Sequence, residues 1–119
     1  MTPFGATLRR LREDLGLSQT ELADLLGLHS RNISAVETGR RQPPPADVLK
    51  HWAQLVGFTN LELEQLEEAA KDSPYVIRLP KTASPRALKL AHRVVRALND
   101  LQQGQISAIH RVLEQGEKS

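Results

Sequence analysis

A chain of 119 residues with a net charge of +2 is long enough for one small domain, or for one domain with an appended element. It contains no cysteine, which excludes disulfides and thiolate metal sites, and no apolar run approaches the roughly 20 residues of a membrane span. Aromatic residues make up only 3% of it, so the core must be aliphatic, which favours a helical bundle over a sheet. The start lacks the apolar core of a secretion signal, and we expect a cytoplasmic protein.

A first helix is expected from Phe4 to Leu15, because leucines recur there on one face, at Leu8, Leu11 and Leu15. Arg12 lies close to this face and would need a carboxylate partner if it turned inward. A second helix is expected after Ser18, which forms a capping-box pattern with Glu21.

The second helix has an apolar stripe that ends at Gly27: Leu22, Ala23, Leu25 and Leu26. A third helix follows at about residues 30–38, with Ile33 and Val36 facing the same core and Gly39 at its end. Two short helices joined by a tight turn that contains glycine describe a helix-turn-helix.

The outer face of the third helix has the chemistry of a surface that meets DNA. At about 100° per residue its outward positions carry no acidic side chain: Arg31, Ser34, Ala35 and Thr38. Arginine can bond O6 and N7 of guanine, hydroxyls bond several base edges, and a methyl group packs on thymine. Arg40 and Arg41 follow, where a docked helix would bring the loop to the phosphates. An ordinary solvent-exposed helix face would look similar, so these residues alone leave both interpretations open.

Two further helices complete the predicted domain over residues 1–72. After the prolines at 43–45, which cannot continue a helix, a fourth helix is expected from about Ala46 to Val56. A fifth begins at a second capping-box pattern, Thr59 with Glu62. The fourth helix has an apolar face that includes the only tryptophan: Val48, Leu49, Trp52, Leu55 and Val56.

Several of these segments closely resemble the DNA-binding domain of the Cro/CI (XRE) family of phage and bacterial repressors, from about Leu8 to Leu66. The matching segments are Gly16–Gln19, Glu21–Ala23, Gly27, Ile33–Ser34, Glu37–Arg41 and Pro43. The resemblance implies an all-α fold: a five-helix repressor-like helix-turn-helix domain that binds double-stranded DNA and regulates transcription.

The resemblance also assigns roles to residues. The base-reading positions would be Ser30, Arg31, Ser34 and Ala35, and because serine and alanine are short, readout is expected to depend mainly on Arg31. Arg12 and Glu37 would form the ion pair that joins the first helix to the end of the recognition helix. His29 stands where the family commonly has a Ser or Thr cap, so Ser30 is expected to cap the helix instead. Phosphate contacts are expected from Ser18, Gln19, Thr38, Arg40 and Arg41.

The remaining residues divide into a linker, 73–84, and a helical segment, 85–119. Tyr75–Leu79 alternates weakly, as a strand would, but is interpreted as part of an extended linker. An apolar repeat then runs from Leu88 to Leu113 and is interrupted at Gly104. Either one long helix crosses this point or two helices fold back as a hairpin. The hairpin is favoured, because glycine in a helix interior costs roughly 1 kcal/mol relative to alanine.

This segment is too short to bury its apolar stripe by itself, so it must pack on the first domain or on a second copy. The second copy is favoured, because a two-fold dimer reads two half-sites about 34 Å apart. The expected homodimer interface is Leu88, Ala91, Val95, Leu98, Ile109 and Val112.

Charge is unevenly distributed between these regions. Residues 60–72 contain one lysine and five acidic residues, whereas residues 73–119 contain eight Lys or Arg and three acidic residues. The two segments are either complementary surfaces or separately solvated helix faces.

An enzyme is not expected. The four histidines, at positions 29, 51, 92 and 110, lack metal-ligand spacing, and no phosphate loop or nucleophile elbow is present. No catalytic residue, cofactor or metal site is therefore predicted. The favoured interpretation is a dimeric repressor that occludes a promoter at an inverted-repeat operator. The alternative is an antitoxin or protein–protein adaptor with a repressor-like fold, whose partner would be a toxin or an antirepressor.

Overall fold

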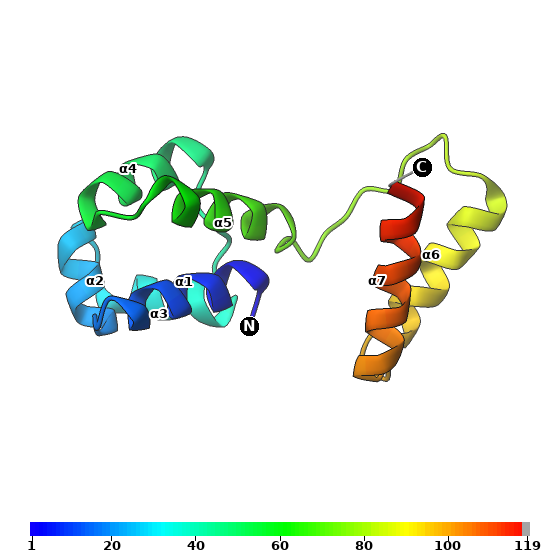
Figure 1. Cartoon of the computed structure of the whole chain (residues 1–119), viewed down its shortest axis with the longest axis horizontal. Helices are drawn as coiled ribbons and strands as arrows, with labels where there is room; N and C mark the ends of the chain where they lie inside the picture. The colour runs from blue at the N-terminus through cyan, green and yellow to red at the C-terminus, as the bar shows by residue number, and fades with distance from the viewer. Residues whose placement is uncertain (118–119) are drawn as a thin grey trace. The chain divides into compact units, whose positions relative to one another are not determined.

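The computed structural model describes residues 1–117, and this range contains seven helices and no strand, which confirms the all-α prediction. The chain divides into two compact units: an N-terminal unit, Met1–Ile77, and a C-terminal unit that begins at Arg78. Figure 1 shows α1 to α5 in the first unit and α6 with α7 in the second. The helices are α1 (Pro3–Asp14), α2 (Gln19–Leu26), α3 (Ser30–Thr38), α4 (Ala46–Val56), α5 (Asn60–Lys71), α6 (Pro85–Ala97) and α7 (Gln103–Glu117).

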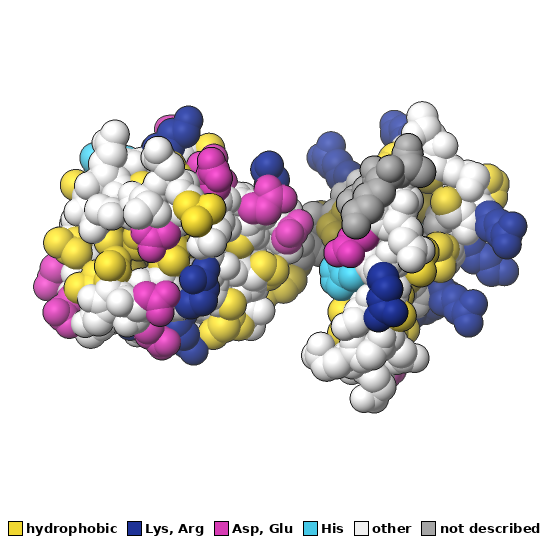
Figure 2. Space-filling model, viewed as in Figure 1, with side chains coloured by type: hydrophobic (Ala, Val, Ile, Leu, Met, Phe, Trp, Pro, Cys, Tyr) yellow, Lys and Arg dark blue, Asp and Glu magenta, His cyan; other side chains and the backbone are white. Residues whose placement is uncertain are grey.

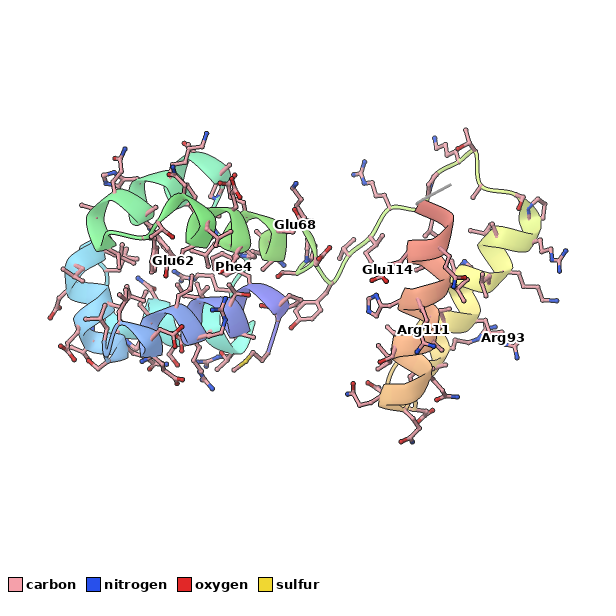
Figure 3. The ribbon with its side chains drawn as sticks, viewed as in Figure 1. Phe4, Glu62, Glu68, Arg93, Arg111 and Glu114 are labelled. Atoms are coloured by element: carbon pink, nitrogen blue, oxygen red, sulfur yellow. The ribbon has the colours of Figure 1, made fainter. Side chains whose placement is uncertain are left out.

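The core of the N-terminal unit is mainly aliphatic, as expected from the scarcity of aromatic residues. α1 packs against α3 and α5, and α2 packs against α3 and α4. Figure 3 shows Phe4 pointing from α1 towards α5, where it is fully buried. The buried side chains with no more than 1% exposure include Phe4, Leu8, Leu11, Leu22, Ile33, Leu49 and Leu66.

Caps define the helix starts that the sequence predicted. The backbone N–H of Glu21 donates to Ser18 Oγ at 3.0 Å, and that of Ser18 donates to Glu21 Oε1 at 3.1 Å. Thr59 and Glu62 form the same reciprocal pair at the start of α5. Each pair satisfies two N–H groups that the helix itself leaves unpaired.

Ser73 closes the N-terminal unit. Its side chain is buried, donates to the carbonyl of Ala69 at 2.7 Å, and accepts from the backbone N–H of Phe4 at 2.9 Å. The end of α5 is thereby held against the first turn of α1. The chain then continues from Tyr75 to Leu79 without forming a strand.

Three leucines that the sequence placed in the core are exposed instead. Leu15, Leu25 and Leu55 expose 47%, 45% and 43% of their surface. Each stands one or two residues before the glycine that follows its helix, where the helix leaves the core. The predicted apolar faces were therefore too wide at their C-terminal ends.

The C-terminal segment forms two helices, but the break does not lie at Gly104 as the sequence suggested. α6 ends at Ala97, whose carbonyl accepts from the N–H groups of Asp100 and Leu101 at 2.9 and 3.1 Å. The N–H of Gln102 then donates to Gln105 Oε1 at 2.8 Å, which starts α7, and Gly104 lies in its first turn. The turn after Ala97 therefore ends the helix. Gly104 does not lie in a helix interior, where glycine would be less stable than alanine.

None of the described side chains from residue 78 to residue 116 is buried. The partly covered side chains in this range are all apolar: Ala83, Ala91, Val94, Ala97, Leu101 and Ile106. Across the described part of the chain, no helix has the length and apolarity that crossing a membrane requires.

Gly5 lies where α1 crosses α3. An added Cβ at Gly5 would collide with the backbone carbonyl oxygen of Glu37 and would lie 2.8 Å from that of Val36. Gly5→Ala should therefore lower the free energy of unfolding of the N-terminal unit by about 1–3 kcal/mol, because a packed helix backbone cannot move aside cheaply. Denaturant titration followed by Trp52 fluorescence measures this change.

The matched control is Gly104→Ala, because an added Cβ at that position meets nothing within 4 Å. It should leave the Trp52 transition where it is. If Gly5→Ala also left the transition unchanged, the close crossing of α1 and α3 would be wrong.

Candidate nucleic-acid interface

The core-facing side of α3 carries a fully buried carboxylate, Glu37. Glu37, near the end of α3, has no exposed surface. Arg12 of α1 binds it through two hydrogen bonds, from Nε to Oε2 at 2.8 Å and from Nη2 to Oε1 at 3.1 Å. The third Arg12 nitrogen, Nη1, donates to the carbonyl of Leu17 at 2.7 Å. The two residues that the sequence paired thus connect α1, the segment before α2, and α3.

Two further donors complete this network, and sequence analysis missed both. Arg9 donates from Nε to Glu37 Oε1 at 3.2 Å. Gln19, expected on a phosphate, donates from Nε2 to the same oxygen at 3.2 Å. The spacing of three between Arg9 and Arg12 puts both on one side of α1, which was the available signal. Gln19 retains one further N–H that this hydrogen bond does not use.

The network changes the pKa of both charged partners. Burial is the largest single influence on Glu37 and by itself would raise its pKa, but the hydrogen bonds from Arg12, Gln19 and Arg9 and the charge of Arg12 together hold that pKa below its ordinary value. The hydrogen bond to Glu37 correspondingly raises the pKa of Arg12. Both groups are therefore charged at neutral pH, and removing the Glu37 charge would leave the buried Arg12 guanidinium without its two-bond carboxylate partner.

Glu37→Gln keeps the size of this side chain and removes its charge, and should lower stability at pH 7 by about 3–5 kcal/mol. A lowered folded pKa means that the unfolded chain takes up the proton first as the pH falls. The stability from Glu37 is complete above the ordinary carboxyl pKa of about 4.3 and is lost as the pH falls through the lowered folded value. Wild type should therefore lose more stability than the variant on going from pH 7 to pH 3, by chemical denaturation.

Glu64→Gln, at an exposed position of α5, is the control and should follow wild type at every pH. Parallel pH profiles for wild type and Glu37→Gln would contradict the charged state of Glu37.

The cap of α3 differs from the expectation. His29, not Ser30, is the N-cap: its Nδ1 accepts from the N–H of Arg31 at 3.2 Å, and its backbone is extended. An imidazole Nδ1 with a free lone pair can take the place of a serine oxygen. Ser30 is consequently the first residue of α3.

The predicted base-reading residues on the outer face of α3 differ in exposure. Arg31 is exposed, whereas Ser30, Ser34 and Ala35 are partly covered. The four predicted base-reading residues thus lie on one short helix, with one long donor and three small side chains. Ile33, Val36 and Glu37 hold the opposite side in the core.

The two arginines after α3 are tied back to it. Arg40 Nε lies 3.2 Å from Thr38 Oγ1, and Arg41 Nη1 donates to Asn32 Oδ1 at 2.9 Å. Thr38 in turn donates its hydroxyl to the carbonyl of Ser34 at 2.8 Å, which leaves its oxygen free to accept from Arg40. Asn32, which the sequence did not single out, thus helps to position the loop. Both guanidinium groups retain unused N–H donors at an exposed surface.

Comparisons with known proteins agree with this geometry. The helix-turn-helix domain family matches residues 3–66, which include every predicted base and phosphate contact. RghRB of Bacillus subtilis (strain 168), named an uncharacterized HTH-type transcriptional regulator, is 35% identical over 97 residues, covering 72% of this chain and 70% of that protein. The chain belongs to the helix-turn-helix transcriptional regulators.

A second similar protein is glutamine–fructose-6-phosphate aminotransferase (isomerizing) of Methanocaldococcus jannaschii. It is 26% identical over 88 residues, which are 74% of this chain but only 8% of that enzyme. This helix-turn-helix chain therefore spans a small part of the enzyme's length. No solved structure matches the chain.

Proposed function

We propose that this regulator is a dimeric cytoplasmic repressor that binds an inverted-repeat operator in double-stranded DNA through α3. The observation that carries the proposal is the exposed Arg31 on an acid-free outer face, flanked by two guanidinium groups tied to the same helix. Arg31 would bond O6 and N7 of a guanine, Ser30 and Ser34 would bond neighbouring base edges, and the Ala35 methyl would pack on a thymine.

Phosphate contacts would hold α3 in the major groove. Arg40 and Arg41 supply charged donors from the loop after α3. Ser18 uses its hydroxyl oxygen as the cap of α2, which leaves the hydroxyl proton for a phosphate. Gln19 would contribute the N–H that Glu37 does not take. These contacts set register and affinity but carry no sequence information themselves.

The C-terminal unit supports a dimer. It has no buried side chain among its described residues, although its two helices carry many apolar ones. Of the predicted interface, Ala91 is partly covered, and the others expose 39–67% of their surface: Leu88, Val95, Leu98, Ile109 and Val112. A second copy would cover this surface, since burying an apolar side chain fully yields about 1.5–3 kcal/mol. Two half-sites bound together would then occlude a promoter.

Arg31→Ala tests base reading. It should lower affinity by about 1–3 kcal/mol at one base pair per half-site and relax specificity there, because a bidentate arginine discriminates by that amount. Enrichment of bound sequences from a random duplex pool measures both quantities. Arg10→Ala, which removes a cation paired with Asp14 on α1, is the control and should leave specificity intact. Equal losses on every sequence would make Arg31 a phosphate contact.

Val95→Glu tests the interface. Val95 exposes 63% of its surface, and a buried carboxylate at a dimer contact should reduce the solution mass from dimer to monomer in sedimentation experiments. Leu90→Glu is matched, because Leu90 is 61% exposed on the same helix but outside the predicted interface. Truncation after residue 84 should likewise give a folded monomer with weak DNA binding.

A truncated chain that remained a dimer would place the interface in the N-terminal unit. A full-length monomer that enriched no sequence would instead favour the adaptor or antitoxin function with a protein partner.

A further inference from the structure

α6 carries its charge in a single row. Its four cations, Arg86, Lys89, Arg93 and Arg96, follow one another at spacings of three and four residues, and α6 has no acidic residue. At about 100° per residue they fall within an arc of about 80°. We name these four residues the basic stripe. Figure 2 shows this row of Lys and Arg along α6, and Figure 3 shows Arg93 directed away from α7.

The basic stripe has no partner among the described residues. All four cations are exposed, and none of them forms an ion pair or a side-chain hydrogen bond there. Apart from the exposed His92, the other sides of α6 are apolar: Ala91 and Val94 are partly covered, and Val95 lies in the proposed dimer interface. A dimer formed through the apolar sides would therefore leave the basic stripe at the surface.

The chain leaves the N-terminal unit beside the end of the recognition helix. An added Cβ on Gly39, the C-cap of α3, would lie 2.8 Å from the Tyr75 hydroxyl and 2.9 Å from Thr2 Cγ2. The hydroxyl of Tyr75, a residue 70% exposed, thus lies next to Gly39, just before Arg40 and Arg41. The ten-residue step from Tyr75 to Pro85 spans at most about 33–36 Å when extended, close to one turn of DNA.

We propose that the basic stripe binds the phosphates of duplex DNA beside the half-site that α3 contacts. This inference rests on the proposed DNA-binding function and adds a second, sequence-independent contact per subunit. From Arg86 to Arg96 the stripe is about 15 Å long at 1.5 Å per residue. One DNA strand presents a phosphate about every 3.4 Å along its axis, so four cations can meet about four phosphates. The footprint of a subunit then extends past its half-site into flanking DNA.

Two other anionic partners are less well matched. A helix that lies on a lipid surface inserts its apolar face, whereas the apolar face of α6 belongs to the proposed dimer interface. The acidic helix α5 of a second copy offers fewer unengaged carboxylates, since Glu62 caps its own helix and Glu68 accepts from Lys71. DNA supplies the regular row of charges that the stripe requires.

The test compares two duplexes that contain the enriched operator. One is trimmed to about 20 base pairs, enough for two half-sites one turn apart, and the other adds about one turn of flanking DNA on each side. Full-length wild type should bind the longer duplex more tightly and with a steeper salt dependence. The variant Arg86→Gln/Lys89→Gln/Arg93→Gln/Arg96→Gln should not distinguish the two. For this variant on the longer duplex, the logarithm of the binding constant should fall less steeply with the logarithm of the salt concentration. The slope should be smaller in magnitude by about 0.9 for each lost phosphate contact.

Arg93→Gln and Arg111→Gln are matched single variants, one in the stripe and one on α7, both labelled in Figure 3. Only Arg93→Gln should reduce the salt slope on the longer duplex. The inference is overturned if the quadruple variant still prefers the longer duplex, or if it instead loses binding to phosphatidylserine vesicles or its dimeric mass with DNA affinity unchanged.

The proposed repressor function and the proposed role of the basic stripe can be tested separately. If wild type enriches no sequence, the repressor proposal is wrong, and the stripe is then measured on a mixed-sequence duplex of about 40 base pairs. Equal affinity of wild type and quadruple variant on that duplex would overturn the stripe as well.

Discussion

A carboxylate buried without any exposure determines how the first three helices can be arranged. Glu37 would be costly in the core, and its charge is tolerated because Arg12, Arg9 and Gln19 all donate to it. α1 and α2 must stay where these donors reach α3. The main chain of the same residue meets α1 at Gly5, where no side chain fits. The side chain and the backbone of Glu37 thus both hold α3 against α1. The inner side of α3 is therefore fixed in the core, and its outer face remains exposed.

Most of the fold could be predicted because helix boundaries depend on local chemistry. Capping boxes at Ser18 and Thr59 gave the right helix starts, since a cap needs only residues three apart in sequence. Thr2 caps α1 and is followed by proline, as Ser84 is at the start of α6, but the cap at Thr2 was not predicted. The exposure of the leucines at helix ends could not be predicted, because it depends on where neighbouring helices stop. The position of the break between α6 and α7 was misjudged at Gly104 for a related reason: a turn after Ala97 competes with it.

The site was less predictable than the fold. Arg12 and Glu37 were paired only through a family resemblance, and the observed bond of 2.8 Å agrees with it. Nothing in the local pattern says that Gln19 turns towards Glu37, because an amide at a helix start has equal access to solvent and to a neighbouring carboxylate. His29 was not expected to cap α3, because the family commonly has serine or threonine at this position. Its Nδ1 nevertheless accepts the hydrogen bond of the cap from the N–H of Arg31. Such choices depend on long-range packing, which a single sequence does not show.

The hydroxyl of Ser73 has a consequence for how the protein is made. It joins the first turn of α1 to the end of α5 across 69 residues of sequence, so the amide of Phe4 is synthesised long before its acceptor. Domains generally fold as units as they emerge during translation. Here, however, the amide of Phe4 has no such acceptor until Ser73 has been added. On the ribosome, the DNA-binding unit is therefore completed only when synthesis has reached the linker, so a nascent chain that ends earlier leaves the first turn of α1 without this closure.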